Sequence, residues 1–148
     1  MQDFKFAVLA AAPAIILHEF GHKFAAMAFG LQAVFKVAYM WLGIGLILRL
    51  SGTGLIFFVP AYVSITNPSG IPPSPLMLSL IAFAGPAVNL ALWIAFSIIL
   101  KKRLITEKYL PLIYIAKQIN MFLFIFNMLP IPGFDGYKVF SGLIQTIF

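Results

Sequence analysis

The chain has 148 residues, of which 62% are hydrophobic and only 9% carry a charge. A water-soluble domain of this size needs many charged surface groups, and ten basic plus four acidic residues do not supply them. The composition therefore excludes an ordinary soluble domain and a disordered chain, and it predicts an integral membrane protein embedded in the lipid bilayer. The absence of cysteine excludes disulfides, thiolate zinc sites and iron–sulfur clusters.

The net charge of +6 does not indicate a nucleic-acid partner. The basic residues are scattered among apolar runs, and no basic stripe of the kind that binds nucleic acid is formed. Their one short cluster, Lys101, Lys102 and Arg103, directly follows an apolar segment. This position is typical of residues that anchor a membrane helix at the lipid headgroups.

The first predicted element is a helix over residues 6–29, long enough to span a hydrocarbon core of about 30 Å. Its middle carries His18, Glu19 and His22, and Gly30 is a helix stop signal. Ionisable residues inside an apolar span are costly, so they mark a candidate functional site.

The next stretch, residues 31–74, is apolar but is interrupted by glycines and prolines. Within it, residues 45–50 and 55–59 flank a glycine-rich turn and predict a short β-hairpin. Because open strands cannot lie against lipid, we expect the hairpin at the interface or covered by helices. A fourth spanning helix over residues 31–50 is the alternative.

Two further spanning helices are predicted over residues 76–100 and 109–129. The first follows a proline cluster and ends at Lys101, and the second ends at Pro130. Residues 130–148 then form an unwound or re-entrant loop and a short helix. The sequence thus predicts a single, mainly α membrane domain over residues 1–148, with three core transmembrane helices.

The sequence His18-Glu19-Phe20-Gly21-His22 is an HExxH motif. On a helix, residues four apart share one face, so the two imidazoles can bind one zinc ion. Glu19 lies beside that face, where it can accept a proton from a water molecule activated by zinc. The motif contains both histidines of the chain and one of its four acidic residues.

A catalytic zinc usually has three protein ligands, and two histidines leave one place open. With neither cysteine nor a third histidine, the missing ligand is a carboxylate. Glu19 has its own role, and Asp3 and Glu107 lie in polar ends and loops. Asp135 remains by elimination, in a proline-rich segment that must be unwound.

Three segments together resemble the site-2 protease family of intramembrane zinc metalloproteases: HEFGH in the first helix, FAGPAVNLAL in the second and NMLPIPGFDG after the third. The resemblance implies that His18, His22 and Asp135 hold one zinc ion and that Glu19 is the catalytic glutamate. It further implies that Asn127 assists near the reacting carbonyl. Asn89 matches an asparagine whose role is substrate positioning or packing.

The family resemblance also implies a function: hydrolysis of peptide bonds within or near transmembrane segments of membrane-protein substrates. It implies short strands whose edge pairs with an unwound substrate, in agreement with the predicted hairpin. The expected protein is a multi-pass protein of the cell membrane, with its active site toward the cytosol and without a PDZ or CBS domain. A homo-oligomer is compatible with this pattern. The alternative function is a non-proteolytic zinc-binding scaffold or metal carrier.

Overall fold

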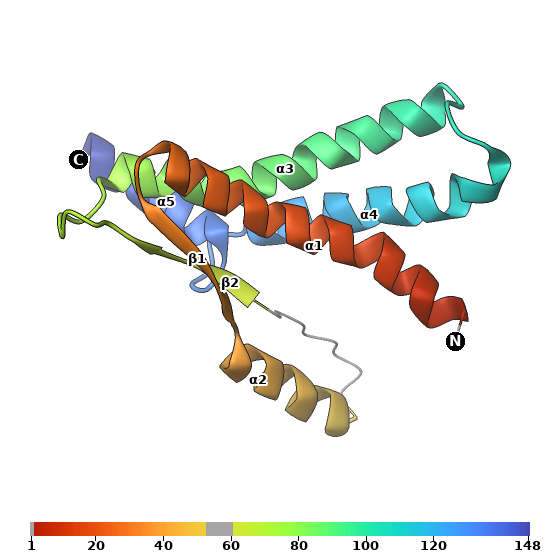
Figure 1. Ribbon diagram of the computed structural model, residues 1–148, viewed down its shortest axis with the longest axis horizontal. Coiled ribbons are helices and arrows are strands. Elements are labelled where there is room, and N and C mark those ends of the chain that lie inside the picture. Colours follow the sequence, from red (N-terminus) through yellow and green to blue (C-terminus); the bar gives the residue numbers. More distant parts are fainter. Residues whose placement is uncertain (1, 53–60) are drawn as a thin grey trace.

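The computed structural model describes residues 2–52 and 61–148, which form a helical bundle with a small sheet at one side (Figure 1). The elements, in chain order, are α1 (Gln2–Ala28), β1 (Gln32–Val37), α2 (Tyr39–Leu50), β2 (Ala61–Thr66), α3 (Pro75–Lys101), the 3-10 turn η1 (Glu107–Tyr109), α4 (Leu110–Asn127) and α5 (Asp135–Ile147).

Helix α3 is the central element of the bundle, because it packs against α1, α4 and α5 (Figure 1). Its start is set by Pro75 and by Ser74, whose hydroxyl accepts a hydrogen bond from the Met77 amide at 3.2 Å. The helix continues through Gly85 and Pro86 without a break. The helices predicted over residues 76–100 and 109–129 correspond to α3 and α4, but α4 begins one residue later and ends two residues earlier than predicted.

In the described part of the chain, two helical segments are long and apolar enough to cross a membrane by length and composition, Pro75–Lys101 and Glu107–Asn127. Helix α1, with 27 residues, covers all but the last residue of the helix predicted over residues 6–29, but it is not one of these two segments. The polar residues in its second half lower its hydropathy. Three spanning helices therefore remain a proposal.

The segment between α1 and α3 contains an antiparallel strand pair, although not at the predicted positions. Strand β1 pairs with β2, with Gln32 opposite Thr66 and Val37 opposite Ala61. The prediction of a strand over residues 45–50 is wrong, because these residues form the second half of α2. The predicted strand over residues 55–59 lies outside the described residues.

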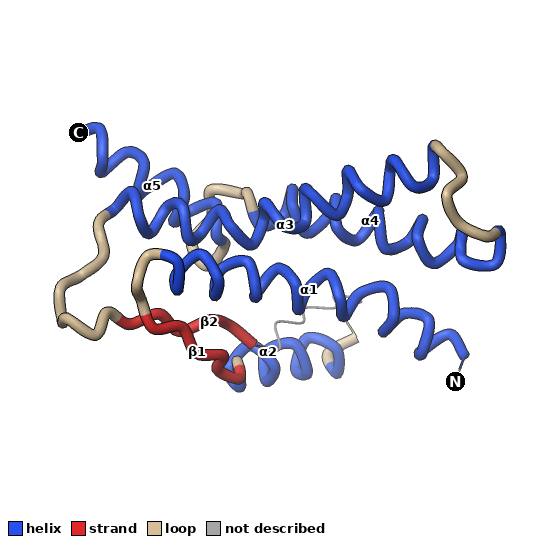
Figure 2. The backbone as a smooth tube through the Cα atoms, turned by 45° about the horizontal axis from the view of Figure 1, so that its top comes forward, coloured by secondary structure: helices blue, strands red, loops and turns tan. Residues whose placement is uncertain are grey.

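The alternative of a spanning helix over residues 31–50 is also wrong. Residues 32–37 are a strand, and α2 has only 12 residues, which corresponds to a length of about 18 Å. A short apolar run fits both strand and helix periodicity, so the sequence pattern could not separate the two. Helix α2 lies away from α3 and α4, at the far end of the strand pair (Figures 1 and 2).

Small residues allow the helices around α3 to approach closely. A Cβ atom on Gly21 of α1 would lie 2.7 Å from the Ala84 carbonyl oxygen of α3. On the other side, the Ser79 hydroxyl of α3 donates a hydrogen bond to the Val139 carbonyl of α5 at 3.0 Å. These contacts pack α1 and α5 against the first half of α3.

Candidate metal centre

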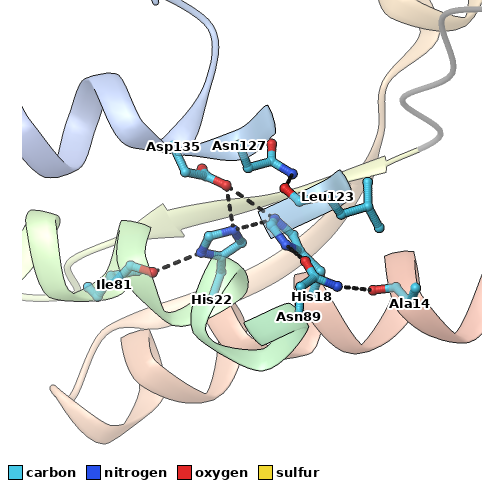
Figure 3. Close-up of polar contacts among 8 residues, drawn as sticks. All are labelled: Ala14, His18, His22, Ile81, Asn89, Leu123, Asn127 and Asp135. Carbon is cyan, nitrogen blue, oxygen red and sulfur yellow. Dashed lines mark hydrogen bonds and ion pairs between the residues drawn. The ribbon is translucent and has the colours of Figure 1, made fainter. Parts of the chain in front are cut away.

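Three side chains from two ends of the sequence converge on one point. His18 and His22 come from α1, and Asp135 is the first residue of α5 (Figure 3). The Asp135 Oδ2 atom lies 3.1 Å from His18 Nε2 and 3.2 Å from His22 Nε2, and the two Nε2 atoms are 3.1 Å apart. Both histidines are buried, with exposed fractions of 6% and 8%. In the described residues, these three side chains form a group that could hold a metal ion.

The loop after α4 brings Asp135 back to the histidines. Pro130 and Pro132 prevent the continuation of α4, and Gly133 turns the chain with a φ of +101°. Gly136 allows the start of α5 to pack on the end of α4, because a Cβ atom there would lie 2.6 Å from the Leu129 carbonyl oxygen. The predicted unwound segment is thus a tight turn that delivers the carboxylate.

Hydrogen bonds on the far side of each imidazole define which nitrogen faces the centre. His22 Nδ1 donates to the Ile81 carbonyl at 2.8 Å, and a carbonyl oxygen can only accept. His18 Nδ1 donates to the Asn89 amide oxygen at 2.6 Å. With Nδ1 protonated in both rings, both Nε2 atoms present lone pairs to the same point, as metal ligands do.

The carboxylate of Asp135 is the third potential ligand, and its environment favours the charged form. Burial acts to raise the pKa of Asp135, but when no metal is bound and the two imidazoles are protonated, their Nε2–H groups and positive charges outweigh it and hold the pKa below its usual range. The ionised carboxylate is the form that binds a metal cation.

Gly85 of α3 borders the space between the ligand atoms. A Cβ atom at this position would collide with the His22 Nε2 atom and would lie 2.8 Å from His18 Nε2. The absence of a side chain therefore leaves the lone-pair side of both imidazoles open.

The structure also locates the other predicted site residues. Glu19 is half-buried on α1 next to His18. Asn127 is the last residue of α4, and its amide donates to the Leu123 carbonyl at 3.0 Å (Figure 3). Asn89 is fully buried and contacts His18, so the structure favours packing and positioning over direct contact with a substrate.

Comparison with known proteins adds independent evidence on the family. The protein named "Putative zinc metalloprotease MJ0611" from Methanocaldococcus jannaschii is 37% identical over 139 residues, which cover 92% of this chain and 69% of that protein. The chain belongs to the site-2 protease family. "Putative zinc metalloprotease Rip2" from Mycobacterium tuberculosis is 31% identical in an alignment of 137 positions that covers 83% of this chain. The chain spans about half (51%) of the length of that relative. No protein-family profile and no solved structure matches the chain.

Two groups of this site-2 protease family member were not predicted as parts of its site. One is the Ile81 carbonyl, which carries no sequence signal because every residue has a backbone carbonyl. The other is Asn120 of α4, which donates through Nδ2 to Ala116 and accepts from Asn89. Its signal was an asparagine within an apolar helix, which indicates a side chain that must find a partner inside the bundle.

Proposed function

We propose that the chain is a zinc-dependent intramembrane endopeptidase that cleaves peptide bonds within or near transmembrane segments of membrane proteins. The observation that carries the proposal is the convergence of His18, His22 and Asp135 at 3.1–3.2 Å, with Glu19 next to the first histidine. Two apolar helices of spanning length and relatives named as zinc metalloproteases support it.

The donor set fits zinc in chemistry and in size. Two imidazoles and one carboxylate are a typical ligand set of catalytic zinc sites in proteases. Ligand atoms at 2.0–2.1 Å from a tetrahedral zinc lie about 3.3 Å from one another. The three separations of 3.1, 3.1 and 3.2 Å are close to that value. His18, His22 and Asp135 would therefore hold the ion.

The residues around the centre supply the remaining chemistry. When bound, zinc supplies the Lewis acidity that polarises a scissile carbonyl and activates water. Glu19 accepts the proton of the attacking water and returns it to the leaving amine. Asn127, at the end of α4, is the donor that we assign to the developing oxyanion.

The membrane setting follows from the composition and from the helices. A chain with 9% charged residues and two apolar helices of spanning length is best accommodated as a multi-pass membrane protein. The active site is proposed to face the cytosol, as the family resemblance implies. A substrate helix must unwind before its carbonyls can react, and an extended segment can pair with an edge of the β1–β2 sheet.

The test compares the parent protein with Glu19→Gln, each reconstituted in liposomes with a membrane-protein substrate. We expect one zinc per chain in both proteins and a loss of cleavage of roughly 10²–10⁴-fold in the variant, because the proton acceptor is removed while the ligands remain. Glu107→Gln is the matched control, because Glu107 lies in η1 outside the centre, and it should cleave like the parent.

Two outcomes contradict the proposal. Cleavage by Glu19→Gln at the parental rate would exclude the assigned proton transfer. Absence of cleavage by the parent together with rapid zinc flux into liposomes would identify a metal carrier.

A further inference from the structure

A chain of buried amides links the candidate metal centre to α4. Asn89 of α3 and Asn120 of α4 have exposed fractions of 0% and 1%. Asn89 Nδ2 donates to Asn120 Oδ1 at 2.9 Å and to the Ala14 carbonyl of α1 at 3.1 Å. Its Oδ1 accepts from His18 Nδ1 at 2.6 Å (Figure 3). Three helices thus meet through one hydrogen-bonded network.

Backbone carbonyls determine the orientation of every group in this network. The Ala116 carbonyl accepts from Asn120 Nδ2 at 2.8 Å, so Asn120 must turn its oxygen toward Asn89. The Ala14 carbonyl likewise requires the nitrogen of Asn89, so the Asn89 oxygen faces His18. His18 must then carry its proton on Nδ1, which leaves the Nε2 lone pair for the metal.

We propose that Asn120 is a positioning residue that, together with the Ala14 carbonyl, fixes Asn89 and, through it, the tautomer and ring orientation of His18. This inference rests on the proposed function, because it concerns the zinc site that the function requires. Without Asn120, one N–H of Asn89 loses its partner in the bundle interior, and the amide is no longer held from two sides. Partners of metal-binding histidines affect metal affinity in this way.

A purely structural role for Asn120 makes a different prediction. If Asn120 only joined α3 to α4, its replacement would lower the stability of the bundle and leave the zinc affinity and the His18 ring unchanged. Two measurements separate these roles: the zinc dissociation constant, obtained by competition with a chelator, and ¹⁵N NMR of labelled histidine. The chain has only two histidines, so each imidazole can be followed individually.

The variants are Asn120→Leu and Asn120→Asp. Asn120→Leu removes the acceptor and keeps the branched shape of the side chain, with added bulk. In Asn120→Asp the carboxyl group keeps an oxygen facing Asn89 and, protonated in the apolar bundle, donates to the Ala116 carbonyl in place of Nδ2. Gln118→Leu is the matched control, because it exchanges an amide for leucine on the same helix outside the network. We expect zinc binding to weaken about 3- to 30-fold in Asn120→Leu, below or within the 10- to 100-fold range for direct partners of ligands. Asn120→Asp and Gln118→Leu should stay within about threefold of the parent.

In the NMR spectra, the Nδ1–H proton of His18 should exchange faster with water in Asn120→Leu than in the parent. The other imidazole, His22, donates to the Ile81 backbone and should be unchanged. If Asn120→Leu does not fold, Asn120→Ala removes the same acceptor without added bulk and is measured in its place.

If Asn120→Leu has the same zinc affinity and the same Nδ1–H exchange rate as Gln118→Leu, the inference is wrong. The proposed function is not affected by that result. A parent protein that binds no zinc or cleaves no substrate would instead contradict the proposed function. The exchange of Nδ1–H, measured on the same protein, would still report whether Asn120 holds His18.

Discussion

The surroundings of α1 differ sharply between its contact with α3 and α5 and its contact with the β1–α2–β2 segment. Toward α3 and α5, the side chains of His18, His22 and Asn89 are buried, and every buried side-chain nitrogen or oxygen in the described residues has a hydrogen-bond partner. In the β1–α2–β2 segment, large apolar side chains are exposed, with Tyr39 at 78% and Leu50 at 76%.

In the first region, atoms of neighbouring helices limit which residue fits at a position. In the second region, they do not. At the candidate metal centre, a glycine or an amide is surrounded by closely packed atoms of other helices, so an added methyl group would overlap with them. In α2, the same change meets open space. Matched substitutions in the two regions are therefore expected to differ, and the largest difference is expected beside the ligand atoms.

The largest effect is expected for Gly85→Ala, compared with Gly43→Ala in α2. The added Cβ at position 85 would occupy the space beside both Nε2 atoms, whereas the Cβ at position 43 has no neighbouring atom within 4 Å. We expect Gly85→Ala to weaken zinc binding more than about 100-fold, above the range for changes to the partners of ligands. Gly43→Ala should bind zinc like the parent and gain up to about 1 kcal/mol of helix stability.

Elemental analysis measures the zinc content of the two variants, and competition with a chelator measures their zinc affinity. Equal zinc affinities would show that the metal does not lie beside Gly85.

A smaller effect is expected for Gly21→Ala, which changes the distance between α1 and α3 without touching the ligand atoms. Its Cβ would lie 2.7 Å from the Ala84 carbonyl oxygen and 3.0 Å from a Val88 methyl group. Since the closest atom is backbone, the helices must separate, and we expect a loss of about 1–3 kcal/mol in the free energy of unfolding. Denaturant unfolding in detergent micelles tests this expectation. A stability equal to that of Gly43→Ala would mean that the two helices do not pack this closely.

The sequence was sufficient for the parts of the molecule in which polar groups lie in apolar helices. Such groups must find partners, and so the convergence of His18, His22 and Asp135 could be predicted from the helical spacing of the two histidines and from elimination of the other carboxylates. The extents of α3 and α4 followed from prolines and charges at their ends. The ligand set itself stays a prediction until zinc is measured.

The sequence was insufficient where the outcome depends on backbone atoms of distant residues. The Ile81 carbonyl orients His22, and this contact cannot be predicted from the residue type at position 81, because every residue has a backbone carbonyl. A strand pair was predicted between the first two long helices, but its positions at residues 32–37 and 61–66 were not, because a short apolar run does not distinguish a strand from a helix. Their pairing depends on long-range contacts that a local pattern cannot contain.

The smallest effect is expected at Phe35 of β1, where the strand pair meets α1. The Phe35 ring packs edge-on against Phe20 at 5.2 Å, and the Lys23 ammonium lies 4.7 Å from its centroid. Phe35→Leu removes both interactions, and we expect a loss of about 0.5–1.5 kcal/mol in local stability, confined to the strand pair.

Val34→Leu is the control, because neighbouring strand residues point to opposite faces and Val34 is exposed. Hydrogen exchange of the β1 and β2 amides should therefore accelerate in Phe35→Leu alone, while zinc affinity stays unchanged in both. A loss of zinc affinity in Phe35→Leu would show that the strand pair and the metal centre are coupled rather than energetically separate regions.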